Sequence, residues 1–329
     1  MILRILKSNR SVNYILFPLI GLLFWGNNLL YPNNFPFYEG ESENILFLPV
    51  YKLLKDSLFL QSFFSLIFTI ALAFIVQQIN YRYSFIRIRT MLPASLFVII
   101  VGGLTQIHTM HPVFFGALFL LLVIYRLFSM YDQTKPYSAA FDAGFLLGIG
   151  SLFYFNLILL FPAFLIGIAI LTREYHWRTF VINVIGLFLP WFFAFGFAVL
   201  TEQFLEMLKI LERNIITPNN HFLSNIPLQI FLGFLIILTL IGSIKLIQQY
   251  DTKKVSSRKY FTAFFLIFVF SMASYILVPA TSFEILIITA IPVSYLVSNF
   301  FVFLKSRFWS ELIFAILVGM VIFIEVMAF

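Results

Sequence analysis

Long apolar stretches recur along this sequence from one end to the other, separated by short polar segments. Most of them reach the roughly 18 residues that a helix needs to cross a membrane. The pattern therefore predicts an all-α, polytopic transmembrane helical bundle of about eleven spans. We place the spans at residues 12–31, 58–79, 91–107, 112–130, 138–154, 157–172, 179–200, 227–249, 260–278, 283–304 and 309–328.

Two connections between the spans, 32–57 and 201–226, are much longer than the others on the same side. Residues 45–55 (ILFLPVYKLLK) are apolar with two lysines at their end, and residues 202–213 (EQFLEMLKILER) place apolar residues at helical spacing opposite charges. This pattern predicts interfacial helices that lie on the membrane surface. Because no internal repeat or soluble linker is visible, the chain is predicted to form a single integral membrane domain, 1–329.

Composition supports the membrane interpretation and excludes several classes of protein. Apolar residues make up 61% of the chain and charged residues only 11%, against about 25% in soluble domains. The absence of cysteine excludes disulfides, thiolate nucleophiles and cysteine-ligated metals. Neither a GxxxxGK[ST] loop nor a GxGxxG turn after a strand is present, so an ATP-driven pump and an NAD enzyme are not indicated.

The cations are distributed unequally between the two sides of the predicted bundle. Seventeen of the 21 Lys and Arg residues fall in one set of alternate connections, and only Lys52, Lys55, Lys209 and Arg213 fall in the other. The positive-inside rule makes the first set cytoplasmic. We therefore expect a bacterial cytoplasmic (inner) membrane protein with its N-terminus in the cytoplasm and its C-terminus outside. The basic residues form no continuous domain, so nucleic acid is not an expected partner.

Three carboxylates, Glu39, Glu41 and Glu43, lie in the stretch YEGESEN of the first long outer connection. Such a group could bind a divalent metal ion or supply a general base for an attacking hydroxyl. The alternative is a solvated acidic turn in front of a surface helix. Their position outside the spans makes them the first catalytic candidates, because loops carry function more often than spans.

Four other polar positions have both a structural and a functional interpretation. His108 and His111, in the outer turn QIHTMHP, could bind a metal or a phosphate, or simply form a polar turn. Asp142 is expected either to lie near a helix N-terminus, where the dipole favours an acid, or to pair with a cytoplasmic arginine. Glu284 fits the first turn of a helix that Ser282 caps. No set of three close ligands emerges, so a zinc or non-haem iron site is not expected.

Small residues indicate where helices approach closely. Gly144 and Gly148 are four positions apart in GFLLG, and Gly186 lies in a later span. This small-xxx-small spacing predicts close packing of the helices that carry these glycines.

The order of segments between Pro32 and Phe195 resembles the middle of GT-C glycosyltransferases, which use polyprenyl-linked sugars. In those enzymes a proline-marked outer turn opens a helix that ends in Tyr-Arg. A Gly-rich helix, a short outer turn, a helix that ends in basic residues and a helix with Pro-Trp follow. The matching positions here are Pro112, Tyr125-Arg126, Gly144 to Gly150, Phe153 to Asn156, Arg173 and Pro190-Trp191.

This resemblance implies an essential acid in the first outer loop, which falls on Glu39, Glu41 or Glu43. Family members often have a second acid in the next outer loop and a lysine in the following turn. This chain has histidines and Tyr154 at those places. The resemblance also implies that the outer cations face the phosphate of a polyprenyl phosphate donor; these cations are Lys52, Lys55, Lys209 and Arg213.

The whole chain is also similar to an uncharacterised family of bacterial multi-pass membrane proteins, some of which carry the label beta-carotene monooxygenase. Carotenoid-cleaving enzymes of the propeller type hold iron with four histidines on a soluble β-fold. The four histidines here are predicted to lie on two sides of a helical protein, so that label does not transfer. They are His108, His111, His176 and His221.

These observations favour a transferase that takes a sugar or similar group from a polyprenyl phosphate donor at the outer leaflet. A non-enzymatic scaffold of a cell-envelope complex is the second hypothesis, because the second acid and the lysine are missing. A transporter is the third, and it requires a polar path through the bundle. Membrane lipid is the only partner that the sequence indicates.

Overall fold

A computed structural model of the chain describes residues 2–8, 12–32, 37, 40–86, 88–174, 176–217, 226–248 and 253–327. Within these ranges the chain forms helices joined by turns, and no strand occurs. The helices are α1 (Ile2–Lys7), α2 (Asn13–Leu30), α3 (Leu48–Leu54), α4 (Leu58–Tyr83), α5 (Leu92–Gly102), η1 (Thr105–Ile107), α6 (Pro112–Ser129), α7 (Tyr137–Phe153), η2 (Phe155–Leu160), α8 (Phe161–Leu171), α9 (Trp177–Leu200), α10 (Phe204–Ile216), α11 (Ile226–Gln248), α12 (Val255–Leu277), α13 (Ile285–Phe303) and α14 (Arg307–Met327).

Eight of the described helices are long and apolar enough to cross a membrane: α2, α4, α6, α9, α11, α12, α13 and α14. A helix satisfies its own inner backbone hydrogen bonds, which hydrocarbon requires because it offers no water. Three further predicted spans are shorter apolar helices, namely α5, α7 and the segment that η2 and α8 form together. The all-helical membrane fold is thus confirmed, and the count of eleven spans stays a prediction.

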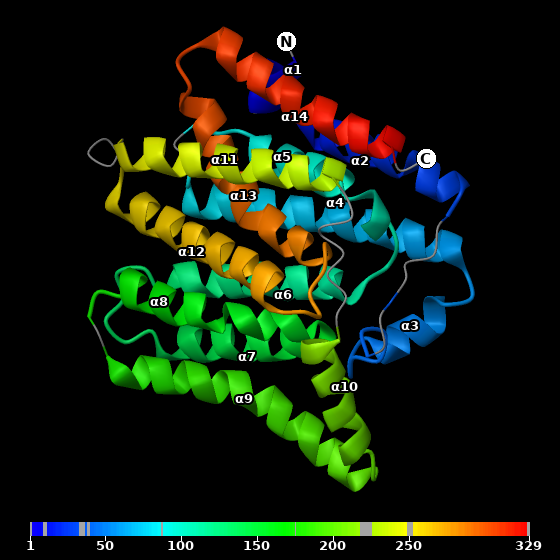
Figure 1. The fold of residues 1–329 in the computed structure, drawn as a ribbon. Coiled ribbons are helices and arrows are strands. Elements are labelled where there is room, and N and C mark those ends of the chain that lie inside the picture. The colour runs from blue at the N-terminus through cyan, green and yellow to red at the C-terminus, as the bar shows by residue number, and fades with distance from the viewer. Residues whose placement is uncertain are drawn as a thin grey trace.

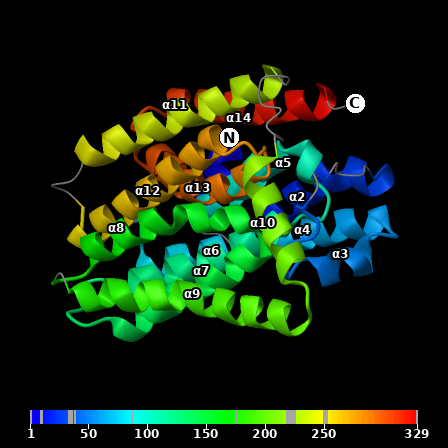
Figure 2. The ribbon, with the colours of Figure 1, turned by 60° about the horizontal axis from the view of Figure 1, so that its bottom comes forward.

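The long helices lie side by side with their axes in one general direction (Figure 1). α13 occupies the middle, where it packs against α5, α6, α11 and α12, and nearly all of its residues are buried. α3 and α10 lie at one end of this bundle, and α10 crosses it in both views (Figures 1 and 2). We name this the α10 end. The opposite end carries the connections that follow α4, α6, α8 and α13, and we name it the basic end.

Large apolar side chains point outward along the rim of the bundle. On α9, for example, Phe192, Phe193 and Phe197 are 71%, 64% and 65% exposed. A soluble protein rarely leaves so continuous an apolar surface in water. The rim is therefore the lipid-facing surface of a membrane protein.

The two predicted surface helices form near the predicted places. The first is α3, which is shorter than the segment 45–55, and the second is α10, which continues to Ile216. On α10, Leu205 and Leu208 are exposed while Met207 is buried against α9. The predicted pairing of Asp142 with an arginine is also confirmed, because Arg126 of α6 contacts its carboxylate.

The close packing predicted for the three glycines is confirmed between α7 and α9. A Cβ atom added to Gly186 would lie 2.5 Å from the carbonyl oxygen of Phe141, and one added to Gly148 would lie 2.5 Å from that of Leu187. Asn183 of α9 also donates a hydrogen bond to the Ala140 carbonyl of α7 at 2.7 Å. The two backbones are thus in direct contact, and no larger residue fits between them.

We predict that Gly186→Leu separates α7 from α9 and lowers the free energy of unfolding by about 2 kcal/mol or more, because overpacking a buried contact costs this much. Thermal unfolding of the purified protein in detergent measures the effect. Gly196→Leu on the same helix is the matched control, since a Cβ atom there meets nothing within 4 Å. Equal unfolding temperatures for the two variants would contradict the prediction.

Candidate functional site

Connections from four parts of the chain meet inside the α10 end of the bundle. They bring together two carboxyl groups, those of Glu41 and Glu284, with the imidazole of His111 and the phenol of Tyr154. All four side chains are buried. Burying ionisable groups is unfavourable unless they are paired, so their concentration at one point marks a candidate site. We name these four residues the buried acid cluster.

A hydrogen bond from His111 holds Glu41 in place, and the backbone N–H of Val113 determines that His111 is the donor. His111 caps α6, and its Nδ1 accepts the backbone N–H of Val113 at 3.1 Å. The proton of the neutral ring is therefore on Nε2, which donates to Glu41 Oε1 at 2.6 Å. Burial lowers the pKa of His111 to about 4, which keeps the ring neutral at physiological pH. Glu41 is thus bound by a neutral imidazole rather than by a cation.

Glu284 lies directly before α13 and accepts two hydrogen bonds through Oε1. The donors are the backbone N–H of Ser282 at 2.7 Å and the hydroxyl of Tyr154 at 3.3 Å. Its Oε2 makes no hydrogen bond with any residue that the structure describes. Burial, and secondly the nearby Glu41, raise the pKa of Glu284 from 4.5 to about 7, although His111 and backbone N–H groups oppose this shift. Near pH 7 the cluster therefore holds a carboxyl group that readily takes or gives a proton.

Aromatic rings surround the cluster and exclude water from it. Phe37 stacks on His111 at a centroid distance of 5.5 Å, and Tyr154 meets the same ring edge-on at 6.3 Å. His108 stacks on Trp25 at 3.8 Å, and burial lowers its pKa to about 3. The Ser65 hydroxyl accepts from the Trp25 indole at 2.8 Å and donates to the His108 carbonyl at 2.9 Å. His108 thus packs α2 against the turn before α6.

The loop that carries Glu41 is fastened to α10. Asn214 donates a hydrogen bond to the Gly40 carbonyl at 3.2 Å, and Arg213 Nη1 lies 3.5 Å from Glu43 Oε2. Gly40 has a φ of 101°, which disfavours any side chain, and an added Cβ atom would lie 2.9 Å from the Arg213 Cβ. The Arg213–Glu43 pair is about half exposed, so it contributes little stability. The buried Asn214 therefore contributes more than this ion pair to holding the loop on α10.

Sequence reasoning singled out nine site residues, and the structure brings Glu41 and His111 together as a hydrogen-bonded pair. Glu43 is instead on the surface beside Arg213. Glu39 lies outside the described residues. The three outer lysines are exposed, on α3, directly after it and on α10, and none forms an ion pair with a described residue; they are Lys52, Lys55 and Lys209.

Two members of the cluster were not among the predicted site residues. Glu284 was interpreted as an acid in the first turn of a helix capped by Ser282. The structure corrects this, because Glu284 precedes α13 and accepts from the Ser282 backbone, while the Ser282 hydroxyl has no partner among the described residues. Tyr154 was noted only as standing where a lysine was expected. An acid at the boundary of an apolar span is the one sequence signal for Glu284.

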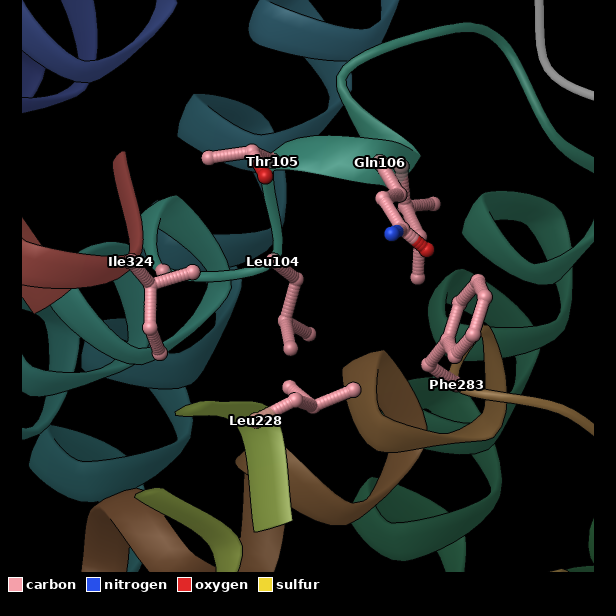
Figure 3. Close-up of a pocket in the computed structure, with 8 residues that line it drawn as sticks. Leu104, Thr105, Gln106, Leu228, Phe283 and Ile324 are labelled. Atoms are coloured by element: carbon pink, nitrogen blue, oxygen red, sulfur yellow. The ribbon is translucent and has the colours of Figure 1, made fainter. Parts of the chain in front are cut away.

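A recess opens at the α10 end beside Phe283, the neighbour of Glu284. It encloses about 250 Å³ and is lined by Gly103, Leu104, Thr105, Gln106, Ile107, Leu228, Phe283 and Ile324. Apolar side chains form its walls, and the Gln106 amide extends toward Phe283 (Figure 3). Leu104 also lines a second, apolar cavity of about 330 Å³, which lies between α5, α11, α12 and α13. The two spaces thus share one apolar wall residue, and Phe283 of the first is the sequence neighbour of Glu284.

The chemistry of the cluster is that of an acid and a base. No group of three or more His, Asp or Glu side chains within the described ranges could hold a metal ion. In the cluster, the neutral imidazole of His111 holds the carboxyl group of Glu41, and the carboxyl group of Glu284, which titrates near pH 7, lies next to it. Such a pair is suited to moving protons.

Residues 41–329 match the model of a family of unknown function (DUF6427). The chain belongs to this family. The matched region contains the whole buried acid cluster and all of the long helices except α2. No curated protein and no solved structure matches the chain. The family confirms the predicted similarity to an uncharacterised group and assigns no activity.

We predict that Glu284→Gln changes how stability depends on pH. The folded protein binds the Glu284 proton more tightly than the unfolded chain does, so this group stabilises the fold below pH about 4.5, and its contribution is lost as the pH rises through about 7. Relative to wild type, the variant should gain up to about 3 kcal/mol in the free energy of unfolding between pH 5 and 8.

Thermal unfolding in detergent across this pH range measures the difference. His111 has a lowered pKa and therefore acts in the opposite direction, losing stability as the pH falls. The difference between the variant and wild type isolates Glu284 because His111 is present in both. Glu43→Gln removes an exposed carboxylate and serves as control. A constant difference across the pH range would refute a buried titrating Glu284.

Proposed function

We propose that this membrane protein is a GT-C-like transferase that moves a sugar or similar group from a polyprenyl phosphate donor at the outer leaflet. The observation that carries the proposal is the convergence of Glu41, His111 and Glu284 inside the α10 end. Three segments far apart in the chain contribute one ionisable residue each. An apolar residue at these places would be less costly to bury, so the cluster is best explained by chemistry.

Glu41 is assigned the role of general base. As the acceptor hydroxyl attacks the anomeric carbon of the donor, its proton passes to the Glu41 carboxylate. The bond from that carbon to the phosphate oxygen breaks, and polyprenyl phosphate leaves with the electron pair. His111 orients Glu41 through the bond of 2.6 Å, and Glu284 provides a nearby site for the proton.

The surroundings of the cluster suit a lipid-linked donor. The recess beside Phe283 and the apolar cavity that shares Leu104 with it present mostly apolar side chains near the cluster. The cations Lys52, Lys55, Lys209 and Arg213 can neutralise the leaving phosphate. Because Glu41 is fully buried, the donor reaches it only when α10 moves, and the hydrogen bond from Asn214 to the Gly40 carbonyl has to open.

We predict that Glu41→Gln abolishes transfer without unfolding the protein. The glutamine oxygen still accepts the hydrogen bond from His111, but the amide cannot take a proton. Loss of a general base lowers rates roughly 10²- to 10⁴-fold. Mass spectrometry of cell-envelope glycans measures the effect in a deletion strain complemented with each variant. Glu43→Gln, which removes an exposed carboxylate two residues away, should complement like wild type.

A non-enzymatic scaffold is the second candidate, and one observation favours it. Glu41 and His111 are completely buried, and both ring nitrogens of His111 already have partners. A structural role predicts that Glu41→Gln, which keeps this bond, has no effect on the glycans. Normal glycans in the Glu41→Gln strain, with normal protein levels, would therefore reject the transferase and favour the scaffold.

The proposed topology places the basic end in the cytoplasm and the α10 end outside. It requires the three shorter helices to cross the inner membrane with the eight long ones, so that the C-terminus is also outside. The support is the distribution of cations between alternate connections. The donor would then approach from the outer leaflet.

We predict that a single cysteine at Lys209 reacts with a membrane-impermeant maleimide on intact cells, while one at Lys305 reacts only after permeabilisation. The chain contains no cysteine, and both lysines are exposed, so each variant carries one accessible label site. Labelling is read by gel shift. The opposite pattern would reverse the topology and remove the outer-leaflet donor.

A further inference from the structure

α11 and α12 follow one another in the chain, yet both pack on α13 rather than on each other across the described residues. In Figure 1 they run side by side along one flank, with α13 behind and between them. The result is a groove whose two walls are α11 and α12 and whose floor is α13. In a bilayer this groove faces lipid.

Near the basic end the groove opens into a space between the helices. There it encloses about 560 Å³ and is lined by Leu240, Ser243, Ile244, Leu246, Ile247, Phe261, Thr262, Phe265 and Leu296. Its walls are almost entirely hydrocarbon, and Ser243 and Thr262 turn their hydroxyls to carbonyls of their own helices. The space therefore suits an alkyl chain and offers little to a polar ligand.

Two lysines lie beside this space: Lys245 stands between the lining residues Ile244 and Leu246, and Lys253 lies two residues before α12. Lys245 Nζ is 4.7 Å from the centroid of the Phe300 ring. Lys253 Nζ donates a hydrogen bond to Asn299 Oδ1 at 2.7 Å and lies 4.4 Å from the centroid of Phe303. It is also 5.3 Å from the centroid of Phe261, which lines the groove. Both ammonium groups are thus held by the last turn of α13.

Neither lysine forms an ion pair with a carboxylate of the described residues. Burial lowers the pKa of Lys253 to about 8. The cost of removing this ammonium group from water is therefore not offset by a neighbouring acid. Arg258 adds a further positive charge nearby, since its Nε donates a hydrogen bond to the Lys253 carbonyl at 3.0 Å. An anion at the mouth of the groove would complete the charge balance.

We propose that an anionic phospholipid binds here, with an acyl chain between α11 and α12 and its phosphate at Lys245 and Lys253. The apolar groove and the cations at its mouth match the two parts of such a lipid. The lipid belongs to the leaflet at the basic end, opposite the buried acid cluster. This site is independent of the proposed transferase activity.

Native mass spectrometry of the full chain in detergent tests the site. We titrate phosphatidylglycerol and phosphatidylcholine with identical acyl chains and expect one site that prefers phosphatidylglycerol. The double variant Lys245→Gln/Lys253→Gln should weaken phosphatidylglycerol binding roughly thirtyfold, which corresponds to about 1 kcal/mol for each lysine. Phosphatidylcholine binding should not change. Glutamine can still donate to Asn299, so the helices keep their contacts.

Three further measurements make the test specific. Ser243→Phe fills the groove and should weaken both lipids. Lys135→Gln/Arg173→Gln removes two exposed charges from the same end, away from α11 and α12, and should leave binding unchanged. Millimolar inorganic phosphate should not displace phosphatidylglycerol. If Lys245→Gln/Lys253→Gln does not fold, Lys253→Gln alone takes its place, with a smaller expected loss of roughly fivefold.

Equal affinity of wild type for the two lipids would overturn the proposal. An unchanged preference for phosphatidylglycerol in the lysine variants would also overturn it. An equally large loss of phosphatidylglycerol binding in Lys135→Gln/Arg173→Gln would do the same. Displacement by inorganic phosphate would show an anion site without a lipid. Each outcome is independent of glycan transfer, so the site and the proposed function can fail separately.

Discussion

Hydrocarbon offers no hydrogen bonds, and this constraint decides where every polar group of the chain can lie. The backbone meets it by forming helices. Buried polar side chains meet it by pairing across helices: Tyr295 of α13 donates to the Val76 carbonyl of α4 at 2.6 Å, and Trp191 of α9 donates to the Ser151 hydroxyl of α7 at 2.8 Å.

The buried acid cluster lies at one end of the bundle, where charged groups usually meet water. Its members are nevertheless excluded from water. Its stability depends on its internal arrangement. The backbone of Val113 fixes the tautomer of His111, which leaves Nε2–H for Glu41. The second carboxyl group avoids a like-charge contact by taking a proton near neutral pH. An acid–base pair shielded from water follows from these local bonds.

Much of the fold was predictable because it depends on local sequence. Apolar runs predicted every long helix, the apolar segment ending in two lysines predicted α3, and helical periodicity predicted α10. Gly144, Gly148 and Gly186 predicted close helix packing, and the structure shows that α7 and α9 are the helices that meet. Glu41 and His111 were both candidates, but their pairing was not foreseen, because 70 positions separate them and no local pattern shows which side chains meet.

Glu284 was misinterpreted for a related physical reason. An acid in front of an apolar span looks the same in sequence whether it stabilises a helix N-terminus or faces another carboxylate. Only the position of α13 in the middle of the bundle decides between the two. The lysine contacts at the other end of α13 were hidden in the same way, since Asn299, Phe300 and Phe303 read as ordinary span residues.

α13 links the two ends of the molecule physically. It begins beside Glu284, and its last turn carries Asn299, Phe300 and Phe303, which hold the two lysines. A helix that is buried on nearly all sides cannot rotate or slide without opening voids. The packing that sets Glu284 against Tyr154 therefore also sets the aromatic rings at the basic end. A chain with few polar residues can position two distinct sites in this way, because one rigid central helix fixes the coordinates of both.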